Sequence, residues 1–375
     1  MNFESILEGR SLIICVGSGG VGKTTTAASI GLRAAHMGKK VLVLTIDPAR
    51  RLANSLGLKQ FGNDETRIDL SSMPDARGEL WAMMLDNRKT FDDLIARLAP
   101  DERSRKSILS NRIYRATADN IVGSHDYMAT EKLYDVVIQG DYDLVVLDTP
   151  PVKNALDFLD APGRLARFLD KRIMKWFLAP YDERKIFGKL VRGTSAIVFR
   201  LLSYIFGRDF LRDLSEYFTV FKDLYDGFRE RQEAVVELFG SDETVFVVVC
   251  APNGPSVEVA EFFLKELKRR EMNNPGVVVN QRHVVLEDNS DVQEALEARA
   301  REIAGPDGDA LVRRVLARLK AAHHRLRELS RVEGQLVGDL RDELRADQDL
   351  WTVPRFEEEV HDLKSLDRVG ATLFG

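Results

Sequence analysis

The sequence predicts an α/β protein with a doubly wound, mostly parallel sheet. Short apolar runs alternate with helical patterns along the chain. Several runs are continuously apolar, which is typical of strands covered on both faces, and helical connections between them favour a parallel sheet. Seven runs are expected to be strands: Leu12–Val16, Val41–Ile46, Leu80–Leu85, Leu144–Leu147, Val245–Cys250, Val277–Val279 and Trp351–Val353.

A glycine-rich segment, GSGGVGKTT, follows the first expected strand and leads into a helical run at 25–36. It matches the P-loop pattern, in which backbone N–H groups and the positive end of the next helix attract phosphate. A glycine-rich turn before a core helix is the simpler alternative, but it does not explain the Lys-Thr pair. The expected phosphate-binding residues are Gly19, Gly20, Val21, Gly22, Lys23, Thr24 and Thr25.

Within this site, Lys23 is expected to bridge the β- and γ-phosphates, and the Thr24 hydroxyl is expected to ligate Mg²⁺. Two later strands end in an aspartate followed by a turn, at Asp47 and Asp148. Asp47 could orient the attacking water or hold a Mg²⁺-bound water, and Asp148 suits a role in the Mg²⁺ shell. The alternative for Asp47 is a cap on the helix expected around 51–56.

Asn280 follows the strand expected at 277–279. Its amide pairs a donor with an acceptor, which matches the N6/N7 edge of adenine, although a turn-forming Asn is the alternative. Pro354 follows the last strand and could close over the base. Because ligands of such sheets bind at the carboxyl ends of strands, these segments are expected to converge on one edge.

Two segments exceed a minimal sheet and are expected to be helical insertions, at about 73–141 and 161–240, within a single P-loop domain spanning 1–375. The second holds about half of the chain's 19 Phe, and residues 163–193 carry nine Lys or Arg against three Asp or Glu. Such a stretch can contact an anionic membrane or an apolar partner helix, or it can be a subdomain core with a basic rim. Residues 291–346 are expected to form a surface-packed helical pair.

Composition narrows the function classes. A net charge of −5 gives no global attraction for nucleic acid, so no nucleic-acid partner is expected. The first residues lack the build of a signal peptide, and no run approaches the ~20 apolar residues of a membrane span, so a cytoplasmic protein is expected. Cys15 and Cys250 each sit in an apolar run without metal-ligand spacing and are expected in the core.

Taken in order, the motifs resemble those of the ArsA-type ATPases, which include the arsenical-pump ATPase and the ATPase that guides tail-anchored proteins to membranes. The matching elements are GSGGVGKTTT, the DPA after the second strand, the DTP of YDLVVLDTPP, VVVNQ and VPRFEEEV, spread over nearly the whole chain. The resemblance implies ATP and Mg²⁺, Asp47 as the switch I carboxylate, Asp148 as the switch II residue and Asn280 at adenine. It also places 161–240 where the tail-anchor-targeting members build a nucleotide-gated hydrophobic groove.

Three departures from that family are visible. Ser18 replaces the signature lysine, which in a dimer reaches the partner's phosphates. The zinc-binding Cys-x-x-Cys and the metalloid cysteine cluster are absent, so no zinc is expected. Switch II continues Pro-Pro-Val-Lys-Asn at 150–154, and Lys153 and Arg50 are candidates to replace the missing cation. The chain resembles most a bacterial branch that lacks the lysine and occurs beside a lysine-bearing paralogue.

Three functions remain open from the sequence. The first is a Mg²⁺-dependent ATPase, as a homodimer or a heterodimer with a lysine-bearing paralogue, whose nucleotide state controls binding of an apolar client or a membrane surface. The second is a poorly hydrolysing nucleotide-binding subunit that needs an active paralogue, which Ser18 motivates. The third is a positioning ATPase of the MinD or ParA type, although residues 367–375 show little sign of a membrane-targeting helix. A cytoplasmic location is expected, with peripheral membrane contact left open.

Overall fold

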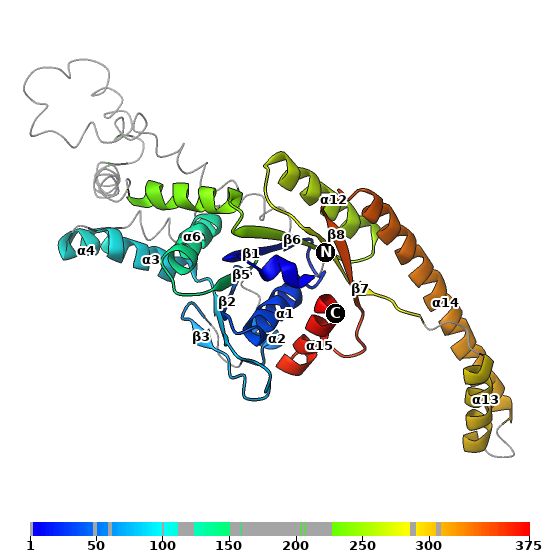
Figure 1. The fold of residues 1–375 in the computed structure, drawn as a ribbon. Coiled ribbons are helices and arrows are strands. Elements are labelled where there is room, and N and C mark those ends of the chain that lie inside the picture. Colours follow the sequence, from blue (N-terminus) through cyan, green and yellow to red (C-terminus); the bar gives the residue numbers. More distant parts are fainter. Residues whose placement is uncertain are drawn as a thin grey trace, which may run out of the picture.

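The computed structural model describes residues 3–47, 51–58, 62–99, 101–111, 124–150, 159, 204, 207, 227–285, 290–304 and 309–375. At its centre is a sheet with the strand order β3-β4-β2-β5-β1-β6-β7-β8 (Figure 1). Neighbouring strands are parallel, except that β3 is antiparallel to β4. The strands are β1 (Leu12–Gly17), β2 (Lys40–Thr45), β3 (Thr66–Arg67), β4 (Glu79–Met84), β5 (Leu144–Asp148), β6 (Thr244–Cys250), β7 (Gly276–Arg282) and β8 (Asp349–Pro354).

The predicted doubly wound, mostly parallel sheet is confirmed, and each of the seven expected strands is present. The strand β3 was not predicted. It is an edge strand of two residues that pairs with β4, so it carries no apolar period that a sequence pattern could reveal.

Helices cover both faces of the sheet. One face of β1 presents Ile13 and Cys15 to η1, α1, α2 and α15, and the other presents Leu12 and Ile14 to α6, the helix at 227–240, α12 and α14. Cys15 and Cys250 are buried free thiols, as expected. Besides the helix at 227–240, the described helices include η1 (Phe3–Leu7), α1 (Lys23–His36), α2 (Arg51–Ser55), α3 (Asn87–Leu98), α4 (Glu102–Ser110), α6 (Ser124–Leu133), the π-helix η2 (Tyr134–Ile138), α12 (Gly254–Arg269), α13 (Ser290–Ala304), α14 (Asp309–Asp342) and α15 (Leu363–Phe374).

The first expected insertion is helical only from Asn87 onward, in α3, α4, α6 and η2. The earlier part, 73–86, consists of a loop and the strand β4, so the boundary at 73 was set too early. Of the second expected insertion, 161–240, the structure describes Tyr204, Gly207 and the helix at 227–240. The rest of that prediction lies outside the described residues.

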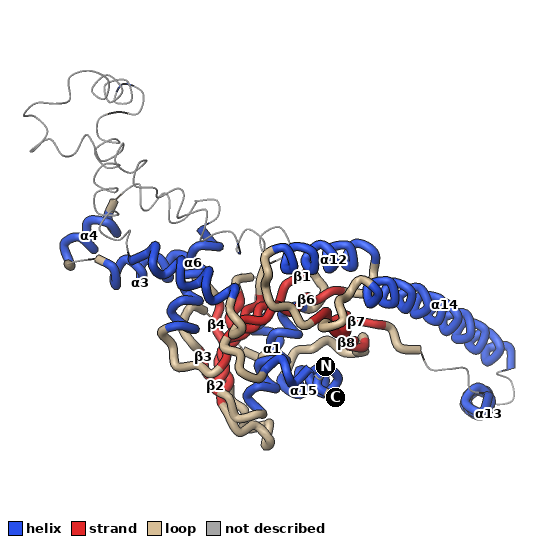
Figure 2. The backbone as a smooth tube through the Cα atoms, turned by 45° about the horizontal axis from the view of Figure 1, so that its top comes forward, coloured by secondary structure: helices blue, strands red, loops and turns tan. Residues whose placement is uncertain are grey.

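The expected helical pair at 291–346 corresponds to α13 and α14, but the prediction that it packs along the surface holds at one end only. The carboxyl end of α14 lies against the sheet layer, where Val337 and Leu340 are buried. The amino-terminal half of α14 extends away from the sheet, with α13 beside it (Figures 1 and 2). Although α14 is 34 residues long, none of the described helices is long and apolar enough to cross a membrane.

Candidate nucleotide site

The P-loop connects β1 to α1 at the carboxyl edge of the sheet. Gly17 and Gly22 have φ angles of 154° and 89°, in the region that favours glycine. A Cβ at Gly17 would lie 2.0 Å from the Val249 carbonyl oxygen, and one at Gly22 would lie 2.1 Å from Asn280 Nδ2. Both positions therefore need glycine for their backbone conformation and for the close approach of the β6 backbone at Gly17 and of the Asn280 side chain at Gly22.

Lys23 lies at the start of α1 and is buried. Its ammonium donates a hydrogen bond of 2.8 Å to the Ser18 carbonyl oxygen, which closes the loop on itself. Burial lowers the pKa of Lys23, and the nearby carboxylates of Asp148 and Asp47 oppose that shift. Burial deprives this ammonium of hydrating water. A phosphate that binds beside it would compensate for that loss by pairing with the positive charge.

Asp148 joins the P-loop to the second strand through one carboxylate oxygen. Its Oδ2 accepts hydrogen bonds from Thr24 Oγ1 at 2.7 Å and from Thr45 Oγ1 at 2.9 Å. Asp148 is 1% exposed, and its Oδ1 has no hydrogen-bond partner among the described residues. Burial is also the main reason why the pKa of Asp148 is raised.

This arrangement suits a hard cation. A buried carboxylate oxygen without a partner requires a cation or a water to satisfy it, and hydroxyl and carboxylate oxygens are the ligands that Mg²⁺ prefers. Within the described part of the chain, no group of three or more His, Cys, Asp or Glu is placed to hold a metal ion. The fit to Mg²⁺ therefore rests on the Thr24 hydroxyl and the Asp148 carboxylate.

Thr45 is a site residue that the sequence analysis missed. It is 1% exposed, donates to Asp148, and accepts a hydrogen bond of 3.2 Å from the backbone N–H of Asp47. Its signal was a single polar residue at the end of an apolar strand, two positions before an aspartate. Thr45 thus connects the two aspartates that were predicted to act together.

Asp47 lies just after β2, and its side chain is 18% exposed. Its Oδ2 is 3.7 Å from Arg51 Nη1 in the first turn of α2, so the carboxylate forms an ion pair with that helix. The two residues that were predicted to replace the signature lysine, Arg50 and Lys153, lie outside the described residues.

Two side-chain amides at the end of β7 hold backbone carbonyls of the P-loop. Asn280 Nδ2 donates to the Val21 oxygen at 2.9 Å, and Gln281 Nε2 donates to the Gly20 oxygen at 3.1 Å. Gln281 has a φ of 63°, which is uncommon for a residue with a side chain. With their carbonyls fixed in this way, the P-loop residues keep their N–H groups available for phosphate.

The Asn280 amide was predicted to bind adenine. In the structure one of its N–H groups is used by Val21, and its Oδ1 accepts from the Gln281 N–H at 2.9 Å. Pro354 ends β8 and pairs in register with Arg282, so it lies next to the same corner. Contact of either residue with a base stays a prediction, while Gln281 was not foreseen at all.

Ser18 occupies the position where the signature lysine was expected. Its Oγ lies 3.0 Å from Ser256 Oγ in the first turn of α12. Ser256 Oγ also accepts a hydrogen bond of 2.9 Å from the Ala251 N–H, at the end of β6. At this position the P-loop therefore contacts α12 of the same chain through two uncharged hydroxyl groups.

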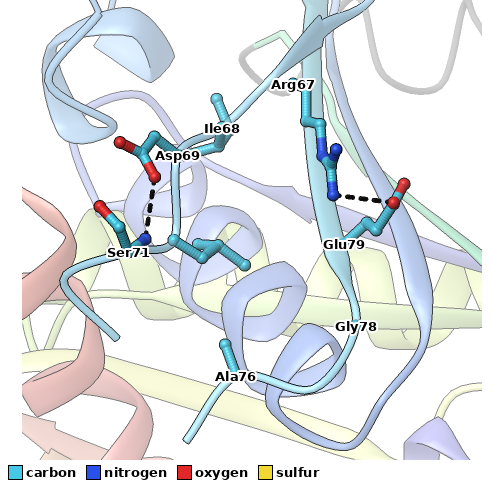
Figure 3. Close-up of a pocket in the computed structure, with 8 residues that line it drawn as sticks. Arg67, Ile68, Asp69, Ser71, Ala76, Gly78 and Glu79 are labelled. Atoms are coloured by element: carbon cyan, nitrogen blue, oxygen red, sulfur yellow. Dashed lines mark hydrogen bonds and ion pairs between the residues drawn. The ribbon is translucent and has the colours of Figure 1, made fainter. Parts of the chain in front are cut away.

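A separate pocket lies away from these residues (Figure 3). Arg67 and Glu79 form an ion pair of 2.9 Å on one side, and Asp69 Oδ1 accepts from the Ser71 N–H on the other. Glu79 begins β4, so the pocket opens at the amino end of that strand, whereas the P-loop lies at the carboxyl edge of the sheet. It is not part of the nucleotide site.

Comparison with known proteins agrees with this geometry. The sequence profile of the anion-transporting ATPase family, ArsA, matches residues 10–304. The chain is 27% identical over 281 residues to ATPase GET3 of Podospora anserina, which covers 74% of this chain and 75% of the relative. It is 26% identical over 302 residues to ATPase get3 of Schizosaccharomyces pombe (79% and 80%) and 29% identical over 290 residues to ATPase get3 of Neurospora crassa (74% and 75%).

The family match covers well over half of the chain and includes the P-loop, Asp47, Asp148 and Asn280. The relatives are named as ATPases, in agreement with a P-loop whose lysine and threonine are placed for a nucleoside triphosphate. The protein is therefore an ATPase that belongs to the anion-transporting ATPase family, ArsA.

Proposed function

We propose that this ATPase is a Mg²⁺-dependent switch that couples its nucleotide state to the binding of an apolar client or a membrane partner. The observation that carries the proposal is the position of Asp148. One of its oxygens contacts both Thr24 of the P-loop and Thr45 of β2. The chain then runs through Thr149-Pro150 toward the Phe-rich segment 161–240. Loss of the γ-phosphate would act first on this junction, whose sequence leads directly to the proposed client segment.

Phosphate binding would use the backbone N–H groups of Gly19 to Thr25 and the amino end of α1. Lys23 would exchange its bond with the Ser18 carbonyl for the β- and γ-phosphates. Asn280 and Pro354 border the corner proposed for the base. The hydrogen bonds from the Asn280 and Gln281 amides to the Val21 and Gly20 carbonyls support the phosphate assignment, because they hold the P-loop in a shape that presents its N–H groups.

Mg²⁺ would be held by Thr24 directly and by Asp148 and Asp47 through water. When bound, it supplies positive charge that stabilises the transferred phosphoryl group. Asp47 would orient the attacking water, helped by Thr45, which holds the backbone of Asp47 and the carboxylate of Asp148 together. The Oδ1 of Asp148, which has no hydrogen-bond partner within the described part of the chain, supports its place near the cation.

The active assembly is proposed to be a dimer, either of two copies or with a lysine-bearing paralogue. The Ser18 contact favours the paralogue: a hydroxyl adds no positive charge to a phosphate, and this one lies against Ser256 of its own chain. The same contact favours the second candidate, a nucleotide-binding subunit that hydrolyses slowly until paired. Both versions would act in the cytoplasm, with peripheral membrane contact when a client is bound.

A positioning ATPase that rides a membrane on its last helix is less well supported. The final described helix, α15, packs onto α1, and Ser29 Oγ donates to the Leu366 carbonyl at 2.9 Å. The apolar side chains of this helix, Leu366, Val369, Leu373 and Phe374, are buried in the core. They are therefore not free to enter a membrane surface.

The dimer proposal is tested with the purified wild-type chain and Ser18→Lys. ATP hydrolysis and the mass in solution are measured with and without ATP and Mg²⁺. A wild-type chain that dimerises and hydrolyses ATP at the rate of the lysine variant contradicts the need for a paralogue. A chain that stays monomeric and slow until lysine is introduced, with nucleotide binding unchanged, supports it.

The coupling proposal is tested by hydrogen exchange of the whole chain without nucleotide, with ATP and Mg²⁺, and with ADP. The expected result is a difference in protection between the ATP and ADP states at the P-loop and also within 161–240. Changes confined to the P-loop would remove the switch proposal while leaving the ATPase assignment intact.

A further inference from the structure

Residues 311–332 of α14 carry an apolar face that nothing in the described structure covers. We call this face the α14 stripe; its members are Leu311, Val315, Leu319, Leu326, Leu329 and Val332. These residues recur three, four or seven positions apart and therefore lie on one side of the helix. Apolar residues on one side of a helix are usually buried, but these are 37% to 57% exposed. At a rise of about 1.5 Å per residue the stripe is about 30 Å long. Isolated exposed apolar residues are ordinary, but a continuous row of this length marks an interaction surface.

The stripe is the exposed continuation of a buried seam. Val312 is buried near the amino end of α14, and Val337 and Leu340 are buried where α14 meets the sheet layer. Leu319, Ala322, Leu326 and Leu329 continue the alternating three- and four-residue spacing between these ends. That spacing is typical of a helix that packs against another helix.

The charge beside the stripe restricts the partner. Between Leu311 and Val332 the chain has seven Lys or Arg and one Asp or Glu. Arg314, Arg318 and Arg325 recur along the same edge of the stripe, and none of the three has an ion-pair partner in the described part of the chain. Two α14 helices side by side would place arginine against arginine, so a second copy of this helix is disfavoured.

The side-chain types also distinguish a helix from a membrane surface. Helices that lie in a membrane interface carry Trp or Phe beside Leu on their apolar face, whereas the α14 stripe contains Leu and Val without an aromatic residue. Leu and Val at heptad spacing are typical of a helix–helix seam. The contact between α13 and α14 already shows the pairing in this molecule, because Glu297 of α13 bridges to Lys320 of α14 at 3.1 Å.

We therefore infer that the α14 stripe binds an acidic amphipathic helix of another protein. An apolar row on that helix would cover the leucines, and a flanking row of Glu or Asp would pair with Arg314, Arg318 and Arg325. The family match ends at residue 304, so the surface belongs to a part of the chain beyond the matched region. The inference does not depend on the nucleotide site or on the client proposal.

The test uses the full chain and two labelled peptides of three heptads, both with Leu at the seam positions. One carries Glu at the flanking positions and the other carries Lys. Fluorescence anisotropy is expected to show binding of the acidic peptide only. Leu319→Ser with Leu326→Ser should weaken that binding about tenfold or more, because two apolar anchors are lost.

Charge reversal gives the sharper result. Arg318→Glu with Arg325→Glu should abolish binding of the acidic peptide and create binding of the basic one. The matched control is Arg313→Glu with Arg331→Glu, which makes the same change in charge on the opposite side of α14 and should leave acidic-peptide binding unchanged.

Four outcomes overturn the inference. Equal binding of both peptides, or acidic-peptide binding that survives the serine substitutions, would remove the stripe as the site. Binding to vesicles of phosphatidylcholine and phosphatidylglycerol that the serine substitutions abolish, without peptide binding, would assign the face to a membrane. A fall in the mass of the chain in solution on serine substitution would assign it to self-association.

Discussion

A single carboxylate, that of Asp148, connects the P-loop, β2 and β5 through its bonds to Thr24 and Thr45. Asp148→Asn keeps the shape and an oxygen acceptor but removes the charge that a cation needs. We expect it to lower Mg²⁺-dependent ATP hydrolysis about 10- to 100-fold, the usual effect of changing a group that acts on a metal through its shell. Phosphate release across a Mg²⁺ titration measures the effect.

The melting temperature of Asp148→Asn shows whether the loss of ATP hydrolysis comes from unfolding. Because burial raises the pKa of Asp148, its ionised form is unfavourable in the folded protein without cation, and the neutral Asn should keep or raise the melting temperature at neutral pH. Asp143→Asn is the control, since Asp143 lies at the opposite end of β5 and accepts from the Lys40 N–H. A similar loss of hydrolysis in both variants would argue against a specific role for Asp148.

Gln281 combines an uncommon backbone conformation with a contact to the P-loop. Gln281→Gly relieves the backbone strain and removes the side-chain amide. The first change acts on stability and the second on the P-loop, so they are seen in different measurements. The melting temperature should stay equal or rise, while the affinity for ATP falls several-fold because the Gly20 carbonyl is no longer held. Isothermal titration alongside thermal unfolding checks this, and affinity unchanged from wild type would show that the contact does not position the loop.

Some residues of the site can be predicted from the sequence and others cannot. Lys23, Thr24 and Asp148 belong to local patterns whose meaning is set by neighbouring residues, and the structure brings Thr24 and Asp148 to 2.7 Å. Gln281 and Ser256 contact the P-loop from far away in the chain, so no local pattern marks them, and the polar residue that ends the strand before Asp47 is the only local sign of Thr45. The roles given to Asp47, Asn280 and Pro354 toward nucleotide remain predictions.

At the scale of elements, a buried ionic cluster joins α6 to the helix at 227–240. Arg231 donates to both Glu131 and Asp135, and Asp135 also pairs with Arg97. Glu131 is 1% exposed, and its Oε2 has no partner among the described residues. Burial outweighs the attraction of Arg231 and raises the pKa of Glu131 from 4.5 to about 7.

This shift predicts a pH dependence. The folded protein binds more protons than the unfolded chain between about pH 4.5 and pH 7, so the contribution of Glu131 is fully present below that window and is lost as the pH rises through it. Glu131→Gln removes the titration and should flatten the decline in melting temperature from pH 5 to 8. Glu230→Gln, at an exposed position on the helix at 227–240, should keep the wild-type slope.

Patterns identified elements better than they placed their ends or neighbours. Apolar runs located the strands because β1, β5 and β6 are covered on both faces. The amphipathic pattern of α14 identified a helix but wrongly implied that its apolar face is covered along its length, since periodicity shows that a face exists and not what lies against it.

For the whole molecule, ligand binding should appear as stability. ATP with Mg²⁺ at about 100 times its dissociation constant should add about 2.7 kcal/mol to the free energy of unfolding. Removing Mg²⁺ with EDTA should reduce that gain, because Asp148 and Thr24 lose the cation that joins them to the phosphates. Thermal unfolding at matched ATP concentrations measures it, and an equal gain with and without EDTA would contradict the assigned cation site.

The composition of the whole chain was informative about the class of protein but not about how charge is distributed over its surface. A net charge of −5 describes the average, while residues 311–332 of α14 carry seven basic residues and one acidic residue. The charge of a surface depends on which residues the fold gathers there, so the basic edge of the α14 stripe became visible only with the helix in place.

The strand order has a consequence for biosynthesis. The central strand β1 is flanked by β5 and β6, which end at Asp148 and begin at Thr244. A ribosome adds about 5 to 20 residues per second, so roughly 5 to 20 s separate the completion of one flank from the start of the other. Throughout that interval the nascent chain offers an unpaired apolar strand edge, and a chaperone that shields it would shorten the time available for misassembly.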